Sequence, residues 1–225
     1  MSAESLWNID QQHMDKPIEQ EMIDYFRSNI HEALSSYCGW KMLSHSKSSG
    51  VVTQRMAERY VEVQKYHPQF FGITERAFLV HFVITILHPF DRDDHAYSLY
   101  KIDREATQKF INENESVLEA LRKLRNQLFA HRDSRIESFS DFVIPSVINL
   151  DQFFKNLMGF YNQLTSRIDN SGTRFSNALD VMRDIEILFM NLYRGETVRK
   201  KEIEIEWDWE KDDKKASDLL AGPEN

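Results

Sequence analysis

The stretch LEALRKLRNQLFAHRD, residues 118–133, decides the fold that we predict for this chain. Leu121, Leu124 and Leu128 recur at spacings of three and four, which places them on one face of an amphipathic helix. The same helix carries several cations and ends in a charged cluster. We therefore expect a helix that packs its apolar face on a core and presents polar chemistry at its C-terminal end.

The composition favours one helical domain with a tail. The chain has 225 residues, of which 41% are hydrophobic, and this is enough to bury a sizeable core. Gly (7 residues) and Pro (5 residues) are scarce, as in long helices joined by short loops. Apolar residues at helical spacing predict further helices over residues 17–37, 52–67, 74–88, 103–111, 145–168 and 175–192.

These elements predict an all-α bundle of about six or seven helices over residues 17–195, after a loose segment 1–16. We expect Thr74 to be the N-cap of the third helix. That helix is apolar on most sides, which predicts a place at the centre of the bundle. Its most apolar part, residues 77–90, is too short to span a bilayer.

The last thirty residues, 196–225, form an acidic aromatic tail that carries half of the net charge of −8. Within it the run EIEIEWDWE, residues 202–210, alternates apolar and acidic side chains, which is a strand pattern. We expect residues 201–210 to dock a partner, such as an antitoxin or regulatory protein, or to cover a positive groove. The rest of the tail has the composition of a disordered segment.

The net charge also limits the partners. A protein that coats duplex DNA is basic, so nucleic-acid binding by this acidic chain would be local to a cleft. The single cysteine, Cys38, cannot form an internal disulfide, and the polar N-terminus has no signal-peptide pattern. We therefore expect a cytoplasmic protein that does not bind membranes.

An Arg followed by a His after four to six intervening residues can act on a phosphodiester, and the chain has two such pairs. In Arg76 with His81 the intervening residues are apolar, so that histidine is expected to face a core. In Arg125 with His131 the Arg is followed by Asn126, and the His lies at a helix end. The second pair is the better candidate site.

The segment LRKLRNQLFAHRD resembles the motif of the HEPN superfamily of helical domains. The layout around it, an apolar helix, a loop into HAYSLYKI and a helix ending in LRNQLFAHRD, is similar to the abortive-infection U-type branch. The resemblance spans residues 18–192. It implies a homodimer that places two copies of the motif in one cleft and cleaves RNA without a metal, as a toxin or anti-phage effector.

The resemblance also implies roles for the site residues. His131 would be the general base or acid, because its pKa normally lies near neutrality. Arg125 would stabilise the charged phosphate, and Asn126 would orient His131 or a phosphate oxygen. Residues near them would support these roles: Arg122 and Arg132 by binding substrate, and Asp133 by biasing the His131 tautomer.

Two alternatives stay open. Arg125 and His131 are six residues apart, about 120° around an ideal helix, so a joint site needs long side chains, a loosened helix or a second subunit. A charged helix end is also often only a favourable partner of the helix dipole, and the chain would then be a non-catalytic interaction module.

A metal site would draw on His81, His88 and His95 with the run DRDD, residues 91–94, but no recognised ligand spacing is present. We expect neither a metal nor a cofactor.

Overall fold

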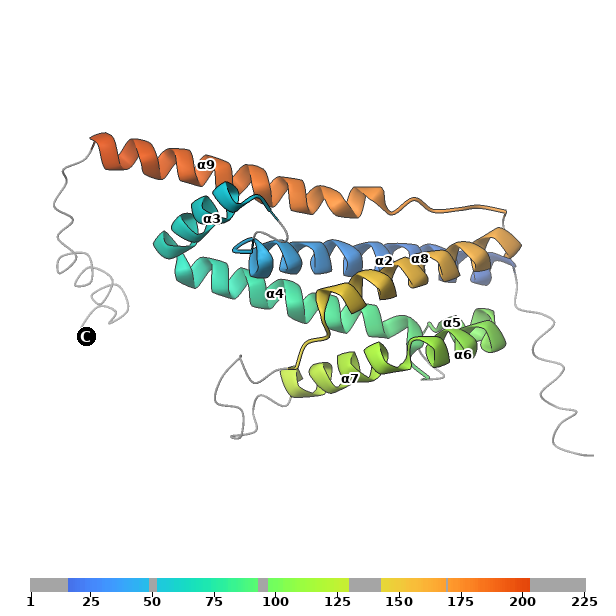
Figure 1. Cartoon of the computed structure of the whole chain (residues 1–225). Helices are drawn as coiled ribbons and strands as arrows, with labels where there is room; N and C mark the ends of the chain where they lie inside the picture. Colours follow the sequence, from blue (N-terminus) through green and yellow to red (C-terminus); the bar gives the residue numbers. More distant parts are fainter. Residues whose placement is uncertain (1–15, 49–51, 93–96, 130–142, 169, 203–225) are drawn as a thin grey trace, which may run out of the picture.

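The computed structural model describes residues 16–48, 52–92, 97–129, 143–168 and 170–202. Within these ranges the chain forms eight α-helices and two short 3₁₀ helices, and no strand (Figure 1). The all-α prediction is therefore confirmed for the described residues. The elements are, in chain order, α2 (Lys16–His45), α3 (Gln54–Tyr66), α4 (Pro68–Leu87), η1 (His88–Phe90), α5 (Leu99–Ile102), α6 (Arg104–Glu113), α7 (Glu115–Phe129), α8 (Val147–Ile168), η4 (Ser176–Leu179) and α9 (Asp180–Glu202).

The predicted number of six or seven helices is too low because of the single turn α5. Its N-cap is Ser98, whose hydroxyl accepts a hydrogen bond from the Tyr100 N–H. Asp103 ends this turn and at once caps α6, where its carboxylate accepts from the Ala106 N–H at 2.8 Å. Because each has its own N-cap, α5 and α6 are two helices, where the sequence pattern predicts a connection followed by one helix.

The central element of the bundle is α2, which contacts α4, α8 and α9 (Figure 1). Phe26, Ile30, Ala33 and Tyr37 follow one another at spacings of four, three and four, and all are buried. These four residues lie along the inner face of a helix of 30 residues, and most side chains between Ala33 and Leu43 are buried as well. The large aromatic side chains on it allow several neighbouring helices to pack against the same element.

Helix α4 differs from its prediction in length and in position. It begins at Pro68, a residue that suits the first turn of a helix, and the Thr74 hydroxyl instead bonds the Phe70 carbonyl inside the helix at 2.8 Å. The prediction of an N-cap at Thr74 is wrong. Phe70 and Ile73 are 57% and 67% exposed, so α4 is not enclosed at the centre of the bundle.

Because α4 is longer than predicted, its length is compatible with a membrane span. With η1 it forms one stretch, Pro68–Phe90, of 23 residues, which by length and composition alone could cross a membrane. Of its most apolar window, 39% is buried inside the protein. The shorter stretch that the sequence indicates, residues 77–90, is too short to span a bilayer.

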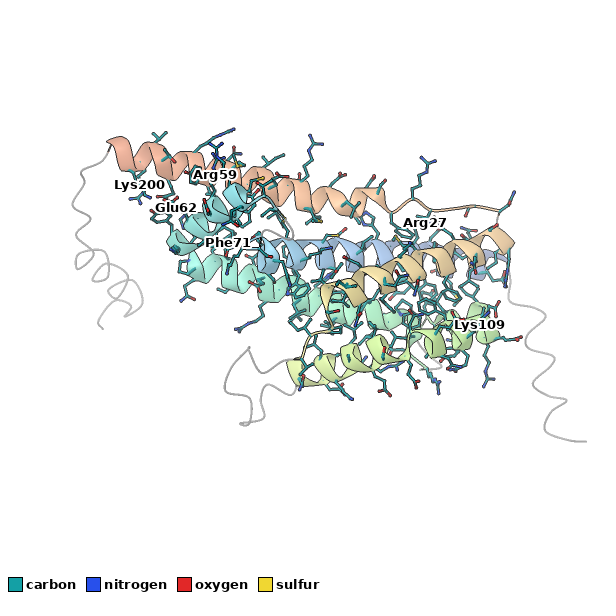
Figure 2. All side chains as sticks on the ribbon, viewed as in Figure 1. Arg27, Arg59, Glu62, Phe71, Lys109 and Lys200 are labelled. Atoms are coloured by element: carbon teal, nitrogen blue, oxygen red, sulfur yellow. The ribbon has the colours of Figure 1, made fainter. Side chains whose placement is uncertain are left out.

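Two hydrophobic clusters hold the helices together. The larger joins α2, α4, α6, α7 and α8, and the smaller joins α3 and α9 to the ends of α2 and α4. In the smaller cluster Phe189 stacks on Tyr60, with ring centroids 4.4 Å apart, and on Phe71 at 5.2 Å. An ion pair between Lys200 and Glu62 joins α9 to α3 beside it (Figure 2).

The last helix buries only part of the face that the apolar spacing predicts. Ile185 is buried, as expected, together with Phe189, whereas Leu179 and Leu188 are exposed. Helix α9 continues to Glu202, beyond residue 195 where the tail was predicted to begin. In the strand predicted at residues 202–210 and the docking segment predicted at residues 201–210, Lys201 and Glu202 are helical. The rest of these segments and residues 1–15 lie outside the described residues.

Candidate functional site on helix α7

Helix α7 is anchored at its start by Asn114. The Asn114 carbonyl accepts a hydrogen bond from the Leu118 N–H at 3.1 Å, as the residue at the N-cap position of a helix does. The Asn114 side chain turns away from α7: its amide donates to the Phe110 carbonyl at 2.9 Å and its oxygen accepts from Asn156 at 3.0 Å. The start of α7 is therefore tied to both α6 and α8.

The apolar face of α7 is Leu118, Leu121 and Leu124, and all three side chains are fully buried in the larger cluster. This part of the predicted face is confirmed. Arg125 stands four residues after Leu121 and seven after Leu118, so its position continues the buried face by one more turn. A cation here lies at the edge of the core, and its side chain is only 32% exposed.

Asp91 is the ion-pair partner of Arg125. The Arg125 Nη1 atom lies 3.6 Å from the Asp91 Oδ1 atom, and the Asp91 side chain is 39% exposed. Charge-assisted hydrogen bonds are shorter, about 2.7–2.9 Å, so the pair is a loose one. Because both groups reach water, their attraction adds little to stability, on the order of 0–1 kcal/mol.

Asp91 is held in place by the turn before it. Its N–H donates to the His88 carbonyl at 3.1 Å and closes η1, where Pro89 stops helix α4. Sequence reasoning assigned Asp91 to a charged loop and did not connect it with Arg125. The one available signal is that an acid two residues after Pro89 is fixed relative to the end of α4, but the sequence does not show which cation it meets.

Arg122 and Asn126 complete the described part of the site. Arg122 is half-buried and Asn126 is exposed. Together with Arg125 they span an arc of about 100° around the helix, since each residue turns about 100°. The structure thus brings three of the predicted site residues to one side of α7. The other three, His131, Arg132 and Asp133, lie outside the described residues.

The charges on α7 are separated along its length. Glu115 and Glu119 lie in its first half, and Arg122, Lys123 and Arg125 lie in its second half. This order complements the helix dipole, which favours acids near the N-terminus and cations near the C-terminus. It also creates a locally positive helix end in an acidic protein.

Two of the other histidines considered for chemistry, His81 and His88, have protein partners, and His95 lies outside the described residues. The His81 Nδ1 atom lies 2.8 Å from the Ser36 hydroxyl, and the His88 Nδ1 atom lies 3.1 Å from the Tyr25 hydroxyl. His81 is exposed, so the prediction that it faces a core is wrong. Among the described residues, no group of three or more His, Cys, Asp or Glu side chains could hold a metal ion.

No protein family, curated protein or solved structure matches the chain. Function is therefore inferred from the residues of α7 and from the motif that they begin.

Proposed function

We propose that this protein is a metal-independent endoribonuclease of the HEPN type, acting as a toxin or an anti-phage abortive-infection effector. The observation that carries the proposal is the position of Arg125, which continues the buried face of α7 yet reaches water, six residues before His131. Arg122 and Asn126 on the same side supply further donors for a phosphate.

The reaction needs no external cofactor. A ribose 2′-hydroxyl attacks the adjacent phosphorus, the bond to the 5′-oxygen breaks, and the products are a 2′,3′-cyclic phosphate and a 5′-hydroxyl. His131 takes the proton of the attacking hydroxyl or gives one to the leaving oxygen. Arg125 donates hydrogen bonds to the phosphate oxygens as their charge grows, and Asp91 holds the guanidinium in place before RNA binds.

The remaining predicted residues bind and orient. Asn126 donates to His131 or to a phosphate oxygen, and Arg122 and Arg132 add affinity for neighbouring phosphates. Asp133 favours one tautomer of His131. In a homodimer each of these residues is present twice, and two positive helix ends then face one RNA strand within an acidic protein.

The first experiment measures RNA cleavage in EDTA by the wild type, Arg125→Ala and His131→Ala. We expect each substitution to lower the rate by roughly 100-fold or more, as for the loss of a catalytic acid, base or charge stabiliser. Lys123→Ala is the matched control, because it removes a cation from the same helix at an exposed position about 160° from Arg125. It should keep the wild-type rate.

Circular dichroism establishes that the four proteins are folded. Equal cleavage by the wild type and both site variants, or cleavage that EDTA abolishes, contradicts the proposal.

The second candidate function is a non-catalytic helical module that binds a partner protein or nucleic acid. The observation that favours it is the ion pair between Arg125 and Asp91, because an arginine in such a pair can have a purely structural role. Asp91→Asn separates the two functions. In a nuclease it lowers cleavage several-fold, since Arg125 is less well positioned, while the melting temperature hardly changes. In a non-catalytic module, the wild type and both variants cleave no RNA, and the loss of the ion pair costs no more than about 1 kcal/mol of stability.

A further inference from the structure

Two exposed tyrosines contact each other on the surface beside η1. Tyr25 belongs to α2 and Tyr97 precedes α5, and their ring centroids are 5.2 Å apart. Tyr25 is 36% exposed and Tyr97 is 40% exposed. Ser98 follows Tyr97 and is buried, and its hydroxyl donates to the Pro89 carbonyl at 3.4 Å, which ties this segment to η1. The tyrosine pair, Tyr25 with Tyr97, thus presents aromatic surface to a further planar group.

Both rings of the tyrosine pair are held by their hydroxyl groups. The Tyr97 hydroxyl donates to the Glu21 carboxylate at 3.0 Å, and the Tyr25 hydroxyl lies 3.1 Å from the His88 Nδ1 atom. The Tyr25 ring also packs edge-on against the buried Phe26, with centroids 5.4 Å apart. The rings are therefore oriented before a ligand binds, which lowers the entropy cost of binding.

The turn η1 connects the tyrosine pair with the proposed site on α7. His88 begins this turn, and the Asp91 N–H donates to the His88 carbonyl at 3.1 Å. In a 3₁₀ turn, side chains three residues apart project from the same side. One of the two contacts Tyr25 and the other pairs with Arg125. A single strand of nucleic acid can therefore lie across η1 and contact both places.

Charge decides which part of a nucleotide fits each place. Asp24 and Arg27 on α2 pair with each other, so their charges largely cancel. The charge of Glu21 remains beside the tyrosine pair, and it repels a phosphate. Arg125 attracts one. A base, in contrast, is neutral and planar, and every base has a π-face that stacks on an aromatic side chain.

We propose that Tyr25 and Tyr97 bind an unpaired base of a single-stranded RNA, with a neighbouring phosphate on Arg125. The place of the phosphate rests on the function proposed above, and the tyrosine pair adds the class of substrate. A base within a duplex is stacked between its neighbours, so only an unpaired base has a face free for the tyrosines. His88 and Glu21 are positioning residues, since they hold the two rings.

The test compares binding of two labelled strands by fluorescence anisotropy. One is a 2′-O-methyl RNA, which has no free 2′-hydroxyl and cannot be cleaved, and the other is the same backbone without bases. We expect the wild type to bind the strand with bases at least about tenfold more tightly. Tyr97→Ala should lose this preference, while its Kd for the base-free strand stays unchanged. Tyr97→Phe keeps the ring and should bind both strands within about twofold of the wild type.

Two further variants separate stacking from charge and from aromatic exposure in general. Arg125→Ala should weaken binding of both strands by the same factor, because it removes a phosphate contact. Phe70→Ala is the matched control, since Phe70 is an aromatic residue that is 57% exposed. It lies about 27 Å along α4 from His88, so its loss should leave both Kd values unchanged. Circular dichroism establishes that each variant is folded.

The outcomes distinguish the base site from the nuclease. Equal binding of the two strands by the wild type, or a folded Tyr97→Ala variant that still prefers bases, overturns the base site, and cleavage in EDTA then judges the nuclease by itself. A preference for bases that Tyr97→Ala abolishes, without cleavage in EDTA, supports the base site and assigns it to a non-catalytic module. A wild type that binds neither strand overturns both proposals.

Discussion

Cys38 lies on α2 beside a polar contact that joins α2 to α8. The Tyr37 hydroxyl donates to the Asp151 carboxylate at 2.8 Å, and the Lys41 ammonium donates to both oxygens of that carboxylate at 2.8 Å. The Cys38 side chain is 3% exposed. Burial raises the pKa of its thiol from 9.0 to about 11, although Lys41 acts in the opposite direction. The folded protein therefore holds the neutral thiol.

This raised pKa predicts a loss of stability in alkali. Below pH 9 the thiol is protonated in both states, so its contribution is fully present. As the pH rises to about 11, only the unfolded chain ionises, and the free energy of unfolding falls by up to about 2–3 kcal/mol from this group. In urea titrations at pH 8 to 11, Cys38→Ala should therefore show a shallower fall than the wild type. Parallel curves for the two proteins would contradict the prediction.

At the scale of the element, the contact between α2 and α4 depends on Gly39. A Cβ atom at this position would lie only 2.8 Å from the Phe78 Cε1 atom, with two more atoms of the ring at 2.9 Å. Real side chains do not approach so closely, so the absence of a side chain lets α4 pack against α2. By contrast, a Cβ at Gly159, within α8, would meet nothing within 4 Å.

These two glycines predict opposite effects of the same substitution. Gly39→Ala should lower the free energy of unfolding by about 1–2 kcal/mol, because overpacking against Phe78 outweighs the gain in helix propensity. Gly159→Ala should raise it by up to about 1 kcal/mol, since only the propensity changes. Urea denaturation of both variants measures the difference. A stabilised Gly39→Ala protein would show that the Phe78 ring moves aside at little cost.

At the scale of the molecule, the two hydrophobic clusters predict two units of unequal stability. The smaller cluster holds α3 and α9 against the rest and depends on the stack of Tyr60, Phe71 and Phe189. The larger cluster contains the buried residues of α7 and α8. The end of the bundle formed by α3 and α9 should therefore open first, without exposing the α7 site.

Phe189→Ala tests this division. The substitution should cost about 3–5 kcal/mol, as is usual for a fully buried phenylalanine. Hydrogen exchange should become much faster in α3 and α9 and change little in α7. Phe153→Ala, in the larger cluster, is the control and should speed exchange in α7 and α8 as well. Equal loss of protection in α3 and α7 for Phe189→Ala would mean that the bundle is one cooperative unit.

Local patterns determine much of this protein. The all-α class, the existence of the long helices and the inward face of α7 follow from the spacing of apolar residues, because a helix repeats every 3.6 residues wherever it is packed. The same regularity places Arg122, Arg125 and Asn126 together on α7. The sequence predicts the all-α class and the inward face of α7 correctly because each depends only on neighbours within one or two turns.

Tertiary structure decides the rest. Helix α2 rather than α4 is central, Asp91 rather than a neighbour on α7 meets Arg125, and Leu188 is exposed although Ile185, three residues before it, is buried. Each of these outcomes depends on which helices lie side by side, and residues distant in the sequence decide that jointly. An apolar helix such as α4 has several faces that could be buried, so its own sequence cannot select one, and the choice is made by the helices that pack against it.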